Sequence, residues 1–174
     1  RRQRQMCIRD RYIVTCCSTA DMSRTFMETN EVPFAMFHYQ LDGKEYADDL
    51  YSSISPEVFY KMIGDGAQPV TSQVNAEAYC ALFEPVLKSG KDVLHLTLSS
   101  EISGSINSAN VAKTQMEEKY PDRRVMVVDS LAASSGYGML VEQTLENQRA
   151  GMSLEENAAW IVAHRNTLHH WFFS

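Results

Sequence analysis

The stretch DVLHLTLSSEISGSINSAN, residues 92–110, places an apolar strand, a loop of hydroxyl residues and the start of a helix in direct succession. Its last fifteen residues, 96–110, contain five serines and one threonine. An apolar β-branched run followed by a turn and a segment of helical period is typical of a strand that passes into a helix in a parallel sheet. The question is why so many hydroxyls stand where a buried strand ends.

The rest of the chain repeats this alternation. The predicted strands are 12–17, 33–40, 92–98 and 123–129, and the segments of helical period are 75–90, 105–120 and 140–165. Gly90 and Gly151 are placed to end helices, and Ser153 with Glu156 forms a capping box after Gly151. The order predicts an α/β protein with a three-layer α/β/α, Rossmann-like fold around a mostly parallel sheet.

Composition excludes two classes of protein. The chain has 174 residues, 44% of them hydrophobic, and a net charge of −6, which argues against a general nucleic-acid binder. The basic segment 1–11 is interpreted as a disordered lead-in, with a nucleic-acid arm as the weaker alternative. No run approaches a membrane span, and 12–17 is too short for a signal-peptide core. We therefore expect a cytoplasmic protein without stable membrane insertion.

Four polar loops are expected at one edge of the sheet. They are TCCSTAD (15–21), TSQVN (71–75), SSEISGS (99–105) and DSLAASSGYG (129–138). In open parallel sheets, ligands bind beyond the carboxyl ends of the strands, where helix N-termini favour anions. Each loop taken alone is more typical of a helix cap. SSEISGS has more hydroxyls than one cap uses, and Gly104 allows close approach to a ligand.

In order and spacing, five motifs resemble those of the DegV family of bacterial fatty-acid-binding proteins. They are TCCSTAD, DGKEYADD (42–49), TSQVNAEAY (71–79), TLSSEISGSINSA (97–109) and VVDSLAASSGYGMLV (127–141). The resemblance implies a two-domain α/β protein of the EDD fold that encloses one long-chain fatty acid. It also implies a carrier that presents the acyl carboxylate to a separate fatty acid kinase for phospholipid synthesis, with no cofactor and no catalytic residue of its own.

The resemblance also implies the ligand-binding residues. Thr71 and Ser103 match the family's carboxylate contacts, and Ser72, Ser99 and Ser100 are expected beside them. Ser18, in the first of the polar loops, completes the predicted set. The chain departs from the family where an acidic residue is replaced by cysteine within TCCST, so the role of Cys16 and Cys17 is left open.

The resemblance sets the expected domain boundaries at residues 12–166 for the first domain and 167–174 for the start of a truncated second domain. The arginine side of the family's head-group site would then be missing, and binding would be weak because neutral donors lack charge assistance. Phe37, Met36, Ile102 and Ile106 are plausible contributors to the apolar lining, although such residues are more often plain core.

The main alternative is a small-molecule hydrolase or transferase on the same sheet. Its motifs are poorly matched: SGSIN lacks the second glycine of a nucleophile elbow, and Gly104 belongs to no dinucleotide or P-loop pattern. His95 within an apolar strand reads as a core residue rather than a base. The four cysteines and the histidines show no metal-ligand spacing, so no metal site is expected. For Cys16 and Cys17, small buried filler is favoured over a reactive thiol.

Overall fold

A computed structural model describes residues 12–171, so the predicted lead-in at 1–11 lies outside the described residues. Its main sheet has four parallel strands in the order β2-β1-β6-β7. These strands are β1 (Tyr12–Cys17), β2 (Phe34–Ala35), β6 (Asp92–Thr97) and β7 (Val125–Asp129). The predicted strands 12–17, 92–98 and 123–129 are thereby confirmed within two residues. Their near-continuous burial is typical of a sheet covered on both faces.

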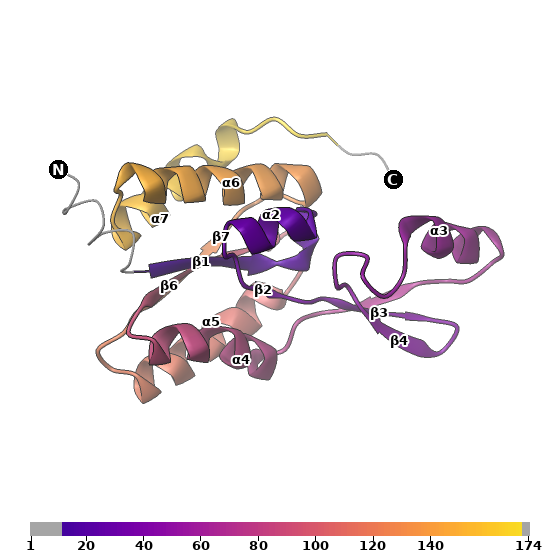
Figure 1. Cartoon of the computed structure of the whole chain (residues 1–174), viewed down its shortest axis with the longest axis horizontal. Helices are drawn as coiled ribbons and strands as arrows, with labels where there is room; N and C mark the ends of the chain where they lie inside the picture. The colour runs from indigo at the N-terminus through magenta and orange to yellow at the C-terminus, as the bar shows by residue number, and fades with distance from the viewer. Residues whose placement is uncertain (1–11, 172–174) are drawn as a thin grey trace.

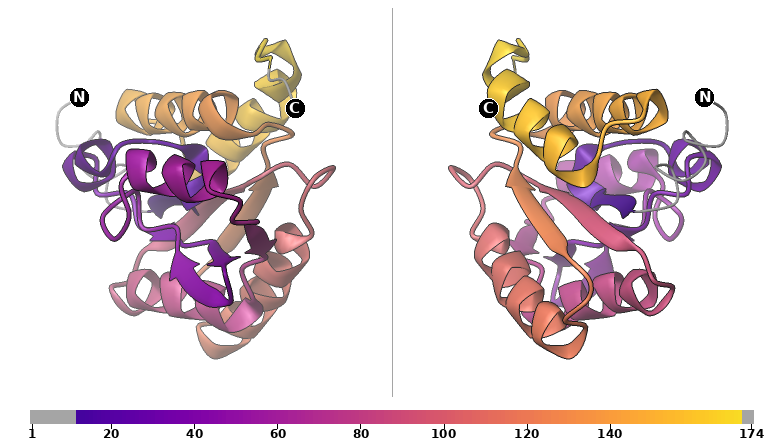
Figure 2. Two further views of the ribbon diagram at one scale, coloured as in Figure 1. Left: turned by 90° about the vertical axis from the view of Figure 1, so that its right-hand side faces the viewer. Right: turned by 90° about the vertical axis from the view of Figure 1, so that its left-hand side faces the viewer.

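Helices cover both faces of this sheet, as the α/β/α prediction requires. On one face lie α4 (Ala76–Lys88) and α5 (Ser105–Lys119), and on the other lie α6 (Ser134–Ala150) and α7 (Leu154–His164) (Figures 1 and 2). Gly151 ends α6 in the left-handed conformation at φ 98°, and Ser153 and Glu156 form the predicted capping box of α7. The short helices are η1 (Ser18–Ala20), α2 (Arg24–Thr29) and η2 (Arg165–Thr167).

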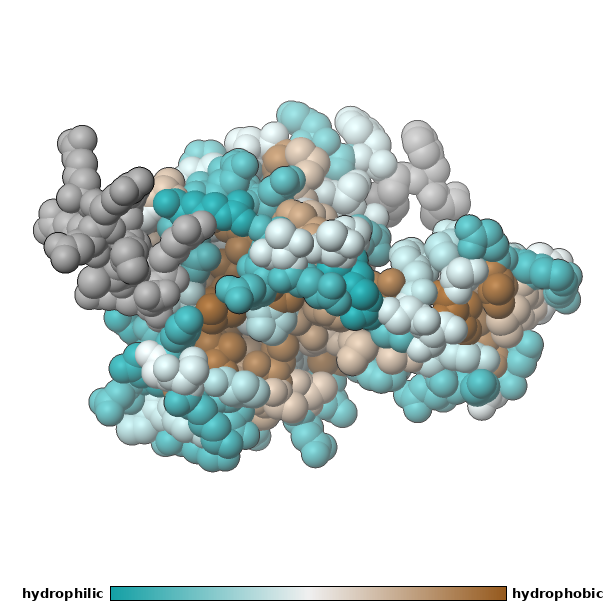
Figure 3. Space-filling model, viewed as in Figure 1, coloured by the Kyte–Doolittle hydropathy of each residue, from teal (hydrophilic) through white to brown (hydrophobic). Residues whose placement is uncertain are grey.

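A second, antiparallel sheet was not predicted. It has the order β4-β3-β5 and consists of β3 (His38–Leu41), β4 (Lys44–Ala47) and β5 (Val70–Ser72). Together with α3 (Pro56–Gly64) it forms a lobe beyond the carboxyl end of β1, with part of its apolar surface exposed (Figures 1 and 3). We call this part, residues 38–72, the small lobe.

Two predictions of local structure were wrong. The segment 33–40 is two strands in different sheets, because Phe37 donates its N–H to the Ser18 hydroxyl (3.1 Å) and the chain leaves the main sheet there. The segment 129–138 is not all loop, since α6 begins at Ser134 and includes Gly136 and Gly138. No helix among residues 12–171 is long and apolar enough to span a bilayer.

Gly138 shows why the second prediction failed. A Cβ at this position would lie 2.6 Å from the Ala20 carbonyl oxygen and 2.6 Å from Met22 Sδ, so the glycine lets α6 pack closely on η1. Glycine is a poor helix former and normally signals a loop. Here the close approach of backbone outweighs propensity, which a single sequence does not reveal.

Gly138→Ala should therefore destabilise the protein by about 1–3 kcal/mol, because the added methyl meets backbone that cannot move aside. Gly64→Ala is the matched control, since a Cβ there meets nothing within 4 Å. By helix propensity alone this control should stabilise by up to about 1 kcal/mol. Urea unfolding measures whether each variant has a higher or lower free energy of unfolding than the parent. A stabilised Gly138→Ala would contradict the packing argument.

Candidate functional site

The loop 98–104 connects β6 to α5 and is held by its own hydrogen bonds. Ser103 N–H donates to the Ser99 carbonyl (3.1 Å), and Ser99 Oγ accepts from Glu101 N–H (3.3 Å). Ser100 is exposed, and its N–H donates to Asp129 Oδ1 (3.2 Å) at the end of β7. The Ser99 hydroxyl thus has a structural partner, while Ser100 stands at the surface.

Ser103 is 92% buried at the start of α5. Its hydroxyl donates to Ser105 Oγ (3.2 Å) and accepts from Ser105 N–H (3.2 Å). The N-cap residue of α5 is Gly104, which has no side chain, so Ser103 satisfies an N–H of the first turn in its place. Ser103 therefore acts as a cap of α5, as the helix-cap interpretation predicts.

The two loops with the strongest predicted contacts meet at one point. The side-chain amide of Gln73 lies within 3.0–3.1 Å of the place that a Cβ on Gly104 would occupy. Gln73 is two residues from Thr71, and Gly104 adjoins Ser103. The structure therefore brings together the TSQVN and SSEISGS loops, and Gly104 is the residue that permits it. We call this contact the Gln73–Gly104 seam.

Thr71 lies on β5 and lines a pocket of about 290 Å³ between the small lobe and the segment that holds Thr19, in η1, and Asp21, directly after η1. Ser103 is not among the residues that line it. The pocket is lined by aromatic and aliphatic residues together with three carboxylates: Thr19, Asp21, Phe37, His38, Tyr39, Ala47, Asp48, Asp49, Tyr51, Ile54, Phe59, Pro69 and Thr71. Phe37 therefore lies beside the predicted site, as its apolar assignment requires.

The remaining predicted site residues are engaged elsewhere. Ser72 is exposed, and its hydroxyl donates to the His38 carbonyl across the small sheet (3.4 Å). Ser18 is fully buried, accepts from Phe37 N–H and hydrogen-bonds to the Asp48 carboxyl group. Both hydroxyls therefore hold the backbone around the pocket.

Of the other apolar residues singled out, none lines the pocket. Ile106 borders a groove beside β7 and α7, whereas Ile102 and Met36 are exposed.

Charge in the pocket is negative. Burial raises the pKa of Asp48, and the nearby carboxylates of Asp21 and Asp49 add to burial in raising the pKa values of Tyr51 and Tyr39 respectively. Thr19 Oγ1 is buried in the pocket wall without a hydrogen-bond partner among residues 12–171. An anionic group is disfavoured beside these carboxylates.

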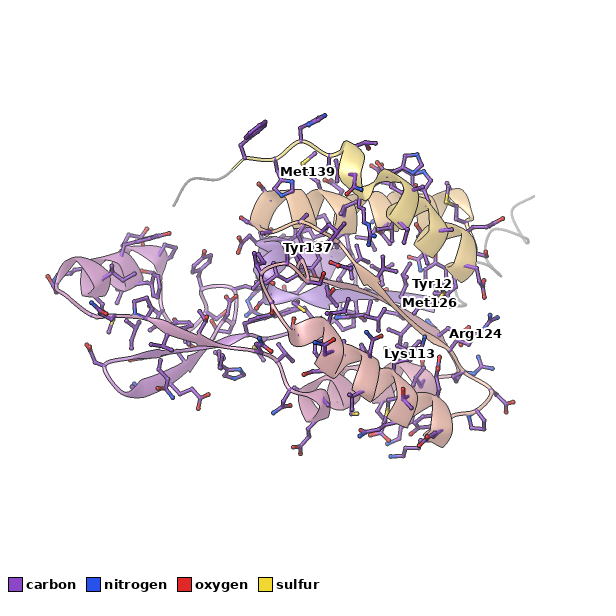
Figure 4. All side chains as sticks on the ribbon, turned by 180° about the vertical axis from the view of Figure 1, so that it is seen from behind. Tyr12, Lys113, Arg124, Met126, Tyr137 and Met139 are labelled. Carbon is purple, nitrogen blue, oxygen red and sulfur yellow. The ribbon has the colours of Figure 1, made fainter. Side chains whose placement is uncertain are left out.

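A buried polar cluster lies behind the Ser103 loop, and sequence reasoning missed most of it. His95 Nδ1 is 2.9 Å from Thr15 Oγ1, and Cys17 Sγ is 3.3 Å from the phenol oxygen of Tyr79. Tyr137, a residue of α6 labelled in Figure 4, accepts from Cys17 N–H (2.9 Å) and donates to the Leu96 carbonyl. The helical period of 75–90 predicts that Tyr79 is buried but gives no signal for its hydroxyl partner.

Burial makes this cluster neutral. Desolvation lowers the pKa of His95 to about 3 and raises the pKa of Cys17 to about 11. Cys16 is also fully buried, and burial raises its thiol pKa well above the usual range. At neutral pH these groups are an uncharged imidazole and two thiols rather than a base and a thiolate nucleophile. The core interpretation of His95 is confirmed.

Metal and disulfide chemistry finds no support in the described part of the chain. No three His, Cys, Asp or Glu side chains of residues 12–171 gather as metal ligands. Cys16, Cys17 and Cys80 are free thiols, while Cys7 lies outside the described residues.

Comparison with known proteins decides the family. The family model described as "Uncharacterised protein, DegV family" matches residues 13–174. The chain belongs to the DegV family. A DegV domain-containing protein of Clostridium perfringens is 32% identical over 162 residues, which cover 93% of this chain and 56% of that protein. The resemblance inferred from the five motifs is thereby confirmed.

Solved DegV structures share the fold. One is a DegV family protein from Thermus thermophilus, with fatty acid binding in its description, at a TM-score of 0.80 and 30% identity over 90% of this chain and 54% of that one. Another is a stearic-acid-binding protein from Eubacterium ventriosum, at 0.79 and 28% identity over 87% and 52%. The chain therefore spans about half the length of the DegV relatives it matches.

The buried imidazole generates a pH prediction. Because the folded-state pKa of His95 is about 3 against an ordinary 6.5, the unfolded state binds more protons between these values. The stability due to a neutral His95 is complete above pH 6.5 and is lost as the pH falls toward 3. His95→Gln should flatten this part of the stability profile, whereas His169→Gln, an exposed control, should leave it unchanged. Parallel profiles for parent and His95→Gln in chemical denaturation would contradict the assignment.

Proposed function

We propose that this chain supplies the hydroxyl side of a binding site for a long-chain fatty acid, with Thr71 and Ser103 as the carboxylate contacts. The observation that carries the proposal is the Gln73–Gly104 seam, which joins the loops of these two residues. The DegV membership supports the ligand class. Ser100, exposed in the same loop as Ser103, is proposed as a further contact, whereas Ser18, Ser72 and Ser99 support the loops through the hydrogen bonds described above.

Electrostatics supports a head group at the seam rather than deep in the Thr71 pocket. Asp21, Asp48 and Asp49 line that pocket and would repel a carboxylate. The aromatic residues of the pocket instead suit methylene groups near the head, each of which contributes about 0.8 kcal/mol when fully buried. The acyl carboxylate is therefore proposed to face hydroxyl donors, and the beginning of the tail to face Phe37 and Phe59.

Affinity in this chain is expected to be low. Neutral hydroxyls provide neither the ion pair nor the bidentate hydrogen bonds that an arginine forms with a carboxylate. A groove bounded on one side also leaves much of a long tail in water. We propose that the remaining wall belongs to the other half of the longer DegV proteins, which this chain does not span.

A carrier is the favoured role. We propose that the protein presents the bound carboxylate to a fatty acid kinase for phospholipid synthesis in the cytoplasm, and uses neither a cofactor nor catalytic residues of its own. The hydrolase alternative requires a base at a nucleophilic serine. Ser103 instead hydrogen-bonds to Ser105, and the nearby His95 pairs with Thr15 and Cys17. No observation in the described residues favours that alternative.

The combined variant Thr71→Val and Ser103→Ala should lose two hydroxyl contacts, about 2 kcal/mol or roughly thirtyfold in affinity. A titration of the isotope-labelled chain with dodecanoate, followed by NMR, measures weak binding and locates it. The parent should show shifts at residues 71–75 and 99–105. Thr114→Val, which removes an exposed threonine of α5, is the control and should bind like the parent. Equal binding by the double variant, or shifts confined to other loops, would overturn the site.

A further inference from the structure

A continuous chain of polar side chains leads from the proposed ligand hydroxyl into the core. Ser103 Oγ donates to Ser105 Oγ, and Ser105 hydrogen-bonds in turn to the phenol of Tyr79. The Tyr79 oxygen lies 3.3 Å from Cys17 Sγ at the end of β1. Four groups from three segments of sequence are thus linked end to end.

Packing keeps this chain of four groups from dispersing. Ser105, Tyr79 and Cys17 are fully buried, so water cannot substitute for a lost partner. The Tyr79 ring stacks on Phe83 with centroids 5.9 Å apart and meets the edge of His95 at 5.1 Å. The Tyr79 ring therefore has little freedom to rotate. Ser105 and Cys17 are the two groups to which its hydroxyl can donate.

A bound carboxylate fixes the donor-to-acceptor direction of this chain of hydrogen bonds. A carboxylate only accepts, so Ser103 must turn its hydrogen outward and give up its donation to Ser105. The buried hydroxyls then remain satisfied if each reverses in turn: Ser105 donates to Ser103, and Tyr79 donates to Ser105. No proton is transferred between residues in this rearrangement, because each hydroxyl only rotates about its C–O bond.

The inner end must also be able to reverse. In the outward arrangement Tyr79 needs a donor, and either atom of the Cys17–Tyr79 pair can donate. A thiol has both a donor and an acceptor, so Cys17 can accept from Tyr79 or donate to it. In the inward arrangement its hydrogen can instead face His95 Nε2, 3.8 Å away.

We propose that Tyr79 and Cys17 are positioning residues for the fatty-acid carboxylate, which act through Ser105 to orient the Ser103 hydroxyl toward the ligand. This inference rests on the proposed function. It also assigns a role to Cys17, which the sequence left open. The thiol is the neutral end of the hydrogen-bond chain and can either donate to Tyr79 or accept from it. Cooperative chains of this kind strengthen each member bond.

Tyr79→Phe removes the link but keeps the ring. In the NMR titration with dodecanoate it should bind about fivefold more weakly, the loss expected from one net hydrogen bond. Tyr12→Phe is the matched control: Tyr12 is equally buried and its hydroxyl is bonded to Met152 and Asn157, at the opposite end of β1. This control should bind like the parent. Ser105→Ala breaks the same chain at another point and should match Tyr79→Phe.

An infrared readout separates positioning from packing. The S–H stretching band of Cys17, assigned by its loss in Cys17→Ser, should shift when dodecanoate is added to the parent and stay fixed in Ser105→Ala. This measurement does not require Tyr79→Phe and remains possible if that variant fails to fold. Absence of any dodecanoate binding by the parent would overturn the proposed function itself. Binding at residues 99–105 with an unmoved band, and with undiminished affinity in Ser105→Ala, would overturn only the positioning role.

Discussion

The Tyr137 phenol forms hydrogen bonds to both β1 and β6 at the point where these strands separate. The loops of the proposed site begin at this point and depend on these hydrogen bonds. Pairing between these strands ends at Thr15 and His95, after which β1 turns to β2. The Cys17 N–H and the Leu96 carbonyl do not hydrogen-bond to each other there. Instead, the Tyr137 hydroxyl accepts from the N–H and donates to the carbonyl. Buried backbone groups without partners are costly, so one side chain from α6 fixes where both polar loops begin.

Local patterns were sufficient for the elements that build the main sheet. The apolar runs identified β1, β6 and β7, and Gly151 and Ser153 marked the break between α6 and α7. The small lobe could not be predicted, because its strands have three or four residues each and its faces are largely exposed. Short exposed strands carry little of the two-residue periodicity on which prediction depends.

For the site, the sequence located the loops but not the use of each hydroxyl. Serine at a strand end predicts a cap or a ligand contact equally well, and only tertiary structure shows that Ser99 and Ser18 are engaged with backbone N–H groups. Tyr79 and Gln73 were missed for a different reason. Their partners, Cys17 and Gly104, lie in other loops, so no local pattern links them.

Thr71 lies on β5 of the small sheet and Ser103 lies in the loop before α5, and the Gln73–Gly104 seam joins these two parts of the chain. The distance between the two hydroxyls is therefore set by how the small lobe packs against the start of α5, and not by either residue alone. A side chain at position 104 would displace the Gln73 amide and alter this contact while leaving both hydroxyls in place. The shape offered to a head group would then depend on a residue that contributes no hydroxyl of its own.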